Sequence, residues 1–161
     1  MTDPTTPNPS PFRIIIAALT LSAAGFGGIV AHEGYSAVAV APVPGDVPTF
    51  GFGTTEGVKL GQTITPPLAV ARALKDVARY EGAVKQCVRV PLAQHEYDAY
   101  ISLAYNIGPG AFCGSSLVRK LNTGDYPGAC AEILRWDKFK GRQLAGLTTR
   151  RKTEYAQCLH S

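Results

Sequence analysis

Charge is scarce in this 161-residue chain, where Asp, Glu, Lys and Arg together make up 17% of the residues. The 16 basic and 12 acidic side chains leave a net charge of +4, which is too small for a nucleic-acid binder with a concentrated basic stripe. Apolar residues reach 45%, which excludes an intrinsically disordered chain. The length suits one folded domain.

Several chemical motifs are also missing. The sequence has no Gly-rich phosphate loop, no G-x-S-x-G and no H-E-x-x-H. No C-x-x-C pair occurs either, which argues against a zinc knuckle or a thioredoxin-type redox site. We therefore expect neither a metal nor a cofactor.

The four cysteines are widely spaced, at Cys87, Cys113, Cys130 and Cys158. An even number at such spacing is typical of two disulfides in an exported protein, and four buried free thiols are the alternative. Of the three possible pairings we favour Cys87–Cys158 with Cys113–Cys130. No cysteine lies in residues 1–86, so a thiol there cannot act as a switch.

The N-terminal part predicts a membrane segment. Residues 1–13 are rich in proline and should form a disordered cytoplasmic tail, followed by an uncharged apolar run over residues 14–31. As a helix this run would reach about 27 Å, just enough to cross a bilayer core. Nine of its 18 positions are Ala, Ser or Gly, so insertion should be marginal. A cleaved signal peptide, a permanent transmembrane helix and a weak anchor that later leaves the membrane are all open, and we favour the weak anchor.

Residues 32–161 predict an α+β domain. Alternating Val, Thr and aromatic residues over 37–55, with turn residues near Gly45, indicate a β-hairpin or a small three-stranded sheet. Helical periodicity predicts a long helix over 65–87, which begins with Thr65 and Pro66 and has one apolar face made of Val70, Leu74, Val77, Val84 and Val88. A second helix is expected between Pro91 and Gly108, with an apolar stripe of Tyr97, Ile101 and Ala104. Shorter helices are expected over 115–122, 126–136 and 148–159. A small sheet lobe joined by a long helix to a helical lobe follows.

Glu33 is the candidate general acid. It follows the apolar run directly, with no basic residue before Lys59, and desolvation against apolar surface favours the neutral form of a carboxyl group. Asp46 is the other acid of the hairpin, in a turn where exposure would keep it ionised. Two carboxylates in contrasting environments are what glycosidic bond cleavage requires. The acids of the helical half, such as Asp76 with arginines at helical spacing, are expected on a solvated face.

The residues around Glu33 resemble a known family. Phage-type lysozymes, glycoside hydrolase family 24, share a Glu…Thr-aromatic-Gly-aromatic-Gly signature, which the chain matches with His32-Glu33-Gly34 and Pro48-Thr49-Phe50-Gly51-Phe52-Gly53. Later segments are similar to the interlobe and following helices of that family, so the resemblance covers residues 32–159 and implies a lysozyme-like fold. The apolar run resembles the signal-arrest-release segment of a subset of these endolysins.

The resemblance implies an active site made of a Glu, an Asp and a Thr. Glu33 and Thr49 match the first and the last. The family spacing leads to Pro42 or Val43 instead of an acid, because this chain has one extra residue between Glu33 and Thr49. We expect Asp46 to take the role of the Asp.

Two residues of the second long helix are candidate substrate contacts. Asn106 falls where the family has a substrate-binding amide on the cleft wall. Tyr105 beside it either stacks on a sugar ring or belongs to the core.

The expected protein is an endolysin that hydrolyses the β-1,4 bond between N-acetylmuramic acid and N-acetylglucosamine in peptidoglycan. Glu33 donates a proton to the leaving oxygen, Asp46 orients water or stabilises the oxocarbenium-like transition state, and Thr49 supports one of them. The partners are peptidoglycan and, through residues 14–31, the bacterial inner membrane, with release to the periplasm as a monomer and no nucleic acid. A non-catalytic peptidoglycan-binding protein and a chitinase-like glycosidase are the alternatives.

Overall fold

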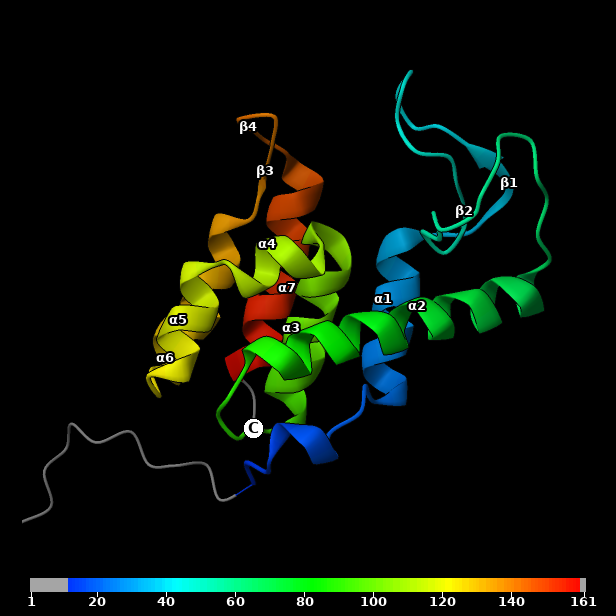
Figure 1. Ribbon diagram of the computed structural model, residues 1–161. Helices are drawn as coiled ribbons and strands as arrows, with labels where there is room; N and C mark the ends of the chain where they lie inside the picture. Colours follow the sequence, from blue (N-terminus) through cyan, green and yellow to red (C-terminus); the bar gives the residue numbers. More distant parts are fainter. Residues whose placement is uncertain (1–11, 160–161) are drawn as a thin grey trace, which may run out of the picture.

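The computed structural model describes residues 12–159, which form a small sheet lobe and a larger helical lobe connected by one long helix (Figure 1). Most of the predicted tail, residues 1–13, lies outside the described residues. The elements in chain order are η1 (Ile16–Ala18), α1 (Ala23–Glu33), β1 (Ser36–Val40), β2 (Thr49–Gly51), α2 (Pro66–Cys87), α3 (Gln94–Ile107), α4 (Pro109–Cys113), α5 (Ser116–Asn122), α6 (Tyr126–Glu132), η2 (Ile133–Arg135), β3 (Lys138–Phe139), β4 (Arg142–Gln143) and α7 (Ala145–Leu159).

Helix α3 is the centre of the helical lobe. Tyr97, Ile101 and Ala104, the predicted apolar stripe, have no exposed surface. The other faces of the helix are buried too, because α1, α2, α4 and α7 all pack around it. Truncating a fully buried Ile such as Ile101 to Ala should cost about 2–5 kcal/mol of stability.

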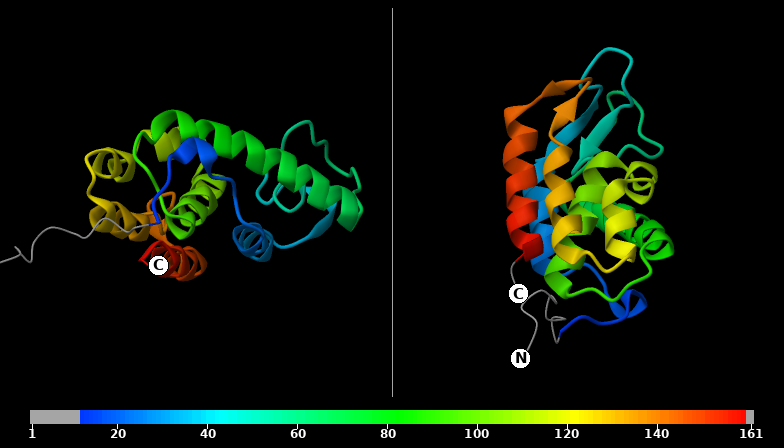
Figure 2. Two further views of the ribbon diagram at one scale, coloured as in Figure 1. Left: turned by 90° about the horizontal axis from the view of Figure 1, so that it is seen from below. Right: turned by 90° about the vertical axis from the view of Figure 1, so that its left-hand side faces the viewer.

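Helix α2 connects the two lobes, as Figure 1 and the left view of Figure 2 show. It begins after Thr65 with a proline at its first position, as predicted, because a proline there loses no intrahelical hydrogen bond. The predicted apolar face of this helix is only half right. Val77 and Val84 are buried, whereas Val70 and Leu74 are exposed.

The buried side chains of α2 are small where the helix packs against the sheet lobe. Ala69 and Ala73 are fully buried there. A Cβ added at Gly51 would lie 3.0 Å from the Cβ of Ala69, so the strand and the helix approach too closely for larger side chains. This close approach explains why the buried face of α2 shifts to alanines in its first half.

The sheet lobe is a hairpin with one extra pairing segment. β1 and β2 are antiparallel, with Ser36 opposite Gly51 and Val40 opposite Thr49. A bridge between Val38 and Thr63 adds a third segment, which fits the predicted hairpin or three-stranded sheet. Its small core consists of Ala39, Phe50 and Val58, with Ile64 packed against it.

Some elements differ from the prediction. The short helix α4 and the β3–β4 hairpin were not expected, and the helix predicted over 126–136 is divided into α6 and η2. Most acids of the helical half are buried and not on a solvated face, with the exposed Asp125 as an exception. Asp76, Glu96, Asp98, Glu132 and Glu154 are each at most 7% exposed and each is hydrogen-bonded to a partner.

The apolar run over residues 14–31 folds into the helical lobe as η1 and the first part of α1. Ser22 begins α1 by accepting a hydrogen bond from the Gly25 backbone N–H. Leu19 and Ile29 are buried in the core of the helical lobe. Among residues 12–159, none of the helices combines the length and the apolar character needed to cross a membrane.

Polar contacts hold this segment on the helical lobe. Arg13 forms a bidentate ion pair with the buried carboxylate of Glu96, with 2.7 Å between Nη2 and Oε1. The Leu21 backbone N–H donates to Glu81 at 2.7 Å. Ser22 donates to Asp98 through both its N–H and its hydroxyl group.

Two disulfides join Cys87 to Cys113 and Cys130 to Cys158. The prediction that the cysteines are paired is confirmed, but the favoured pairing is wrong. Helix α4 brings Cys113 back to the end of α2, where Cys87 lies, and α6 packs against α7, which carries Cys158. The pairing therefore follows from α4, a helix that the sequence pattern did not reveal.

Candidate active site

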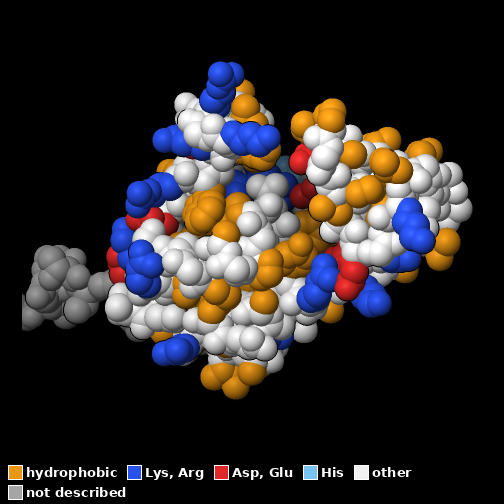
Figure 3. Space-filling model, turned by 45° about the horizontal axis from the view of Figure 1, so that its top comes forward, with side chains coloured by type: hydrophobic (Ala, Val, Ile, Leu, Met, Phe, Trp, Pro, Cys, Tyr) orange, Lys and Arg blue, Asp and Glu red, His pale blue; other side chains and the backbone are white. Residues whose placement is uncertain are grey.

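A cavity of about 320 Å³ opens where α1 ends and the hairpin begins. The space-filling view shows the surface hollowed between the two lobes, with acidic and basic side chains at its floor (Figure 3). The cavity is lined by Glu33, Gly34, Tyr35, Ser36, Val40, Pro42, Thr49, Phe50, Gly51 and Gly53.

Glu33 is the last residue of α1 and reaches this cavity. The helix stops there because Gly34 has a φ of 68°, a left-handed conformation that glycine adopts without strain. The Glu33 side chain is 19% exposed, and its Oε1 accepts a hydrogen bond from Arg150 Nη1 at 2.8 Å. Its other oxygen, Oε2, lies 3.1 Å from where a Cβ on Gly53 would be, so any side chain at Gly53 would crowd the carboxylate.

The surroundings of Glu33 differ from the expectation of apolar surface. Arg150 comes from α7, 117 residues along the chain, and this separation hides it from any local sequence pattern. Arg150 Nε also donates to Glu154 Oε1 at 3.1 Å. The position of Arg150, and through it that of Glu33, therefore depends on Glu154.

Glu154 is the centre of a buried charge network. It is 1% exposed and accepts a hydrogen bond from the Ser102 hydroxyl at 2.7 Å. Arg151, with no exposed surface, has its Nε 2.9 Å from Glu154 Oε2 but outside hydrogen-bond geometry, so this contact is an ion pair. Burial lowers the pKa of Arg151 from its ordinary value. Two arginines and two carboxylates, Glu33 included, balance the charge.

His32 precedes Glu33 at the end of α1. Burial, and then the positive charge of Arg150, lower the pKa of His32. The imidazole is therefore neutral at pH 7 and adds no positive charge beside Glu33.

Thr49 lines the same cavity as Glu33. Its hydroxyl group donates to the Val47 carbonyl at 3.2 Å. Asp46 lies in the exposed turn between β1 and β2, where its backbone N–H donates to Val43. Asp46 is not among the residues that line this cavity.

The two candidate substrate contacts have different surroundings. Tyr105 is 8% exposed, its ring packs against Tyr80, and its hydroxyl donates to the Phe52 carbonyl at 2.9 Å. Burial raises the pKa of Tyr105, so its hydroxyl stays protonated and keeps this bond between the lobes. Of the two alternatives for Tyr105, these contacts favour the core. Asn106 is exposed, and its Oδ1 accepts a hydrogen bond from Arg151 at 3.0 Å, which links it to the charge network.

Tyr35 also lines the cavity and was not among the residues predicted from the sequence. Its side chain is 43% exposed, while its hydroxyl donates to the Ile64 carbonyl at 2.6 Å. Its ring lies 5.6 Å from that of Phe52. The sequence signal was an aromatic residue directly after Glu33-Gly34, since rigid aromatic rings suit sugar binding.

The fold consists of a small sheet lobe that a long helix joins to a helical lobe, and beside the sheet lobe an arginine holds a carboxyl group in a cavity. Together these features define a lysozyme-like glycoside hydrolase. The chain belongs to the phage lysozyme family, whose model matches residues 30–154.

Relatives and solved structures agree with this assignment. An endolysin of Acyrthosiphon pisum secondary endosymbiont phage 1 is 43% identical over 112 residues, which cover 67% of this chain and 77% of the relative. The SAR-endolysin of Pseudomonas phage phiKMV is 36% identical over 141 residues, covering 85% of this chain and 87% of the relative. The muramidase domain of SpmX from Asticaccaulis excentricus superposes with a TM-score of 0.81 at 31% identity, covering 88% of this chain and 99% of that domain.

Proposed function

We propose that this member of the phage lysozyme family is an endolysin that hydrolyses the β-1,4 bond between N-acetylmuramic acid and N-acetylglucosamine in peptidoglycan. The observation that carries the proposal is the position of Glu33, in a cavity with Thr49 and fixed by Arg150. The names of its relatives, endolysin and SAR-endolysin, support the same activity and its use in the lysis of a bacterial host.

Glu33 is the general acid in this proposal. Arg150 holds Oε1, so Oε2, on the Gly53 side, is the oxygen that carries a proton to the leaving glycosidic oxygen. A positioned acid of this kind contributes about 10²–10⁴ to the rate. Tyr35 offers its exposed ring to a sugar bound in the cavity.

Asp46 is proposed as the second carboxylate, which orients water or stabilises the oxocarbenium-like transition state. Its support is that it is the one acid between Glu33 and Thr49. Its exposed turn has to bend toward the cavity when substrate binds. Thr49 supports the reacting groups through its hydroxyl, and Asn106 contacts the glycan from the cleft wall.

Glu33→Gln and Asp46→Asn test the two carboxylates separately. Each variant keeps the size of the side chain and removes its acid. Release of reducing ends from purified peptidoglycan should fall at least about 100-fold in Glu33→Gln and at least about tenfold in Asp46→Asn. Glu56→Gln is the matched control, because Glu56 is exposed and lies outside the cavity, so its activity should equal that of the parent.

The outcomes separate the alternatives. Unchanged hydrolysis in Glu33→Gln would overturn the assignment of the acid, and unchanged hydrolysis in Asp46→Asn would remove Asp46 alone. A parent protein that sediments with peptidoglycan but releases no reducing ends would be a non-catalytic binding protein. Equal cleavage of chitin oligosaccharides, which lack the lactyl group, would favour the chitinase-like alternative.

The route to the periplasm is proposed to pass through the inner membrane. Residues 14–31 enter the bilayer first, later leave it and then fold as η1 and α1. The buried side chains of Leu19 and Ile29 and the ion pair of Arg13 with Glu96 support a stable folded position outside the lipid. Glu33 would stay at the bilayer surface until this folding brings it to the hairpin.

Membrane fractionation and mass spectrometry of protein expressed in a bacterial host test this route. Glu96→Gln weakens the folded position and should increase the fraction of protein in the membrane pellet, with Glu56→Gln as control. A soluble protein whose N-terminus lies at Gly25 or beyond would show cleavage and overturn release.

A further inference from the structure

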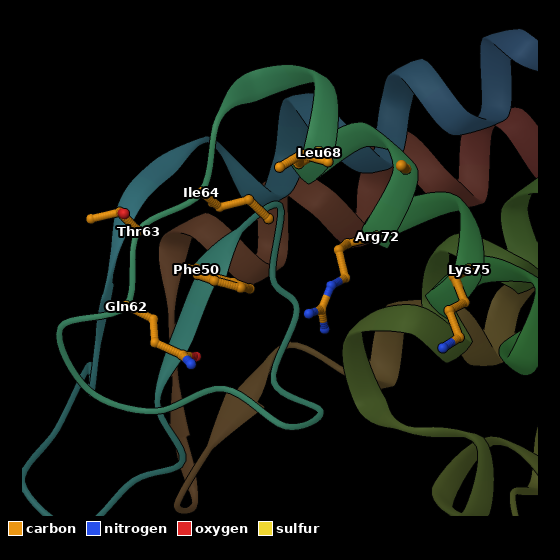
Figure 4. A pocket seen from close by; sticks show the side chains of 8 residues that line it. Phe50, Gln62, Thr63, Ile64, Leu68, Arg72 and Lys75 are labelled. Atoms are coloured by element: carbon orange, nitrogen blue, oxygen red, sulfur yellow. The ribbon is translucent and has the colours of Figure 1, made fainter.

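A second cavity, of about 500 Å³, lies between the sheet lobe and the start of α2. Figure 4 shows it between the segment that carries Gln62, Thr63 and Ile64 and the first turns of the helix. We call it the α2 groove; it is lined by Phe50, Gln62, Thr63, Ile64, Leu68, Ala71, Arg72 and Lys75. It shares Phe50 with the active-site cavity but none of the catalytic candidates.

The groove has an apolar part with exposed aliphatic side chains. Ile64 and Phe50 form its inner wall, next to the small core of the sheet lobe. Of the lining residues, Leu68 is 60% exposed; Leu60, which does not line the groove but lies two residues before Gln62 in the chain, is 67% exposed. Figure 3 shows hydrophobic side chains gathered over this lobe. Exposed aliphatic side chains around a groove mark an interaction surface.

Two cations stand along the groove. Arg72 and Lys75 follow Leu68 at i+4 and i+7, so all three lie on one face of α2. Within residues 12–159 neither cation forms an ion pair with a carboxylate. The guanidinium of Arg72 contacts the Glu56 carbonyl at 3.4 Å, and the Glu56 carboxylate pairs with Arg79. Both positive charges therefore remain available to an anionic partner.

We propose that the α2 groove binds the surface of an anionic phospholipid membrane. Arg72 and Lys75 would contact the lipid phosphates, while Leu68 and Leu60 enter the boundary between headgroups and acyl chains. Charge complementarity favours this occupant over a neutral apolar peptide, and the exposed leucines favour it over a hydrated free anion. Because residues 14–31 are folded into the helical lobe, the groove gives this conformation a membrane contact that does not use the apolar run.

The charges set the expected strength. A basic residue near an anionic lipid surface contributes about 1 kcal/mol, so loss of two should weaken binding about 30-fold. This contribution is screened by salt, so binding should also weaken between low and physiological ionic strength.

Sedimentation of the full chain with vesicles tests the proposal. The vesicles consist of phosphatidylglycerol with phosphatidylcholine, or of phosphatidylcholine alone. The double variant Arg72→Gln with Lys75→Gln removes the groove charges, and Leu68→Gln removes an aliphatic contact. The matched control is Lys138→Gln with Lys140→Gln, which removes the same charge from the exposed β3–β4 hairpin on the other lobe.

We expect the parent protein to bind phosphatidylglycerol vesicles. Its affinity should fall about 30-fold in the groove double variant, fall further when Leu68→Gln is added, and stay unchanged in the control double variant. Equal binding by the groove and control variants would overturn it, since net charge or residues 14–31 would then explain the binding. Equal binding to both kinds of vesicle would overturn it as well. Thermal unfolding confirms that each variant is folded, and peptidoglycan hydrolysis is not needed for the readout.

Discussion

Glu154→Gln tests the buried charge network that positions Glu33. The substitution keeps the shape of the side chain but removes its charge. Glu154 is 1% exposed and contacts Ser102, Arg150 and Arg151. In the variant, Arg151 stays fully buried with its positive charge no longer balanced.

The cost follows from this burial. Removing one partner of a buried ion pair typically costs about 3–5 kcal/mol, because the remaining charge is left uncompensated in a medium of low polarity. A protein of this size loses about 2–4 °C of Tm per kcal/mol, so Tm should fall by about 6–20 °C. Activity below the melting range should also fall, because Arg150 loses the carboxylate that orients it toward Glu33.

Thermal and urea unfolding followed by circular dichroism measure the loss. Glu56→Gln is the matched control, since Glu56 pairs with Arg79 at 2.9 Å but both side chains are more than half exposed. An exposed pair contributes about 0–1 kcal/mol, so this variant should unfold close to the parent. A loss below about 1 kcal/mol in Glu154→Gln would refute the idea that the network stabilises the active site.

Two further predictions concern the helical lobe. Hydrogen bonds from Lys120, and then from Ser116, lower the pKa of Glu132 from 4.5 to about 2. Between these two pH values the unfolded chain binds more protons than the folded chain, so the free energy of unfolding falls as the pH falls. In urea unfolding, Glu132→Gln should therefore be less stable than the parent at pH 6, and the difference should shrink by pH 3; a constant difference would contradict this. Replacing Cys130 and Cys158 by alanine opens a crosslink that spans 28 residues, which should cost about 3–4 kcal/mol, measured as a lower Tm than that of the oxidised parent. Because reduction opens both crosslinks, a double variant that melts between the reduced and the oxidised parent supports this, and one that melts with the oxidised parent does not.

The elements with strong local signals could be predicted from the sequence. Helix α2 begins within one residue of the predicted start and ends at Cys87, because a proline and a helical apolar pattern fix it locally. Helix α3 lies between Pro91 and Gly108 as expected. The hairpin that carries Thr49 was also identified by its own alternating pattern.

Long-range features could not be predicted in the same way. The partner of Glu33 is 117 residues away, and no local spacing connects it with Arg150. Residues 14–31 are apolar enough for either lipid or a protein core, so hydrophobicity alone does not say where Ile29 is buried. The acids Glu96 and Asp98 are buried because the N-terminal segment supplies their donors, which helical spacing in the chain does not reveal.

Both crosslinks lie in the C-terminal half of the chain and together enclose residues 87–113 and 130–158. Neither disulfide involves α1 or the β1–β2 hairpin. Within residues 12–159, the segment that carries Glu33 is therefore connected to the rest only by the backbone and by non-covalent contacts. We therefore expect that α1 can open without breaking either crosslink. Backbone amides of α1 should exchange with deuterium by such partial opening at a lower free energy than those of α3.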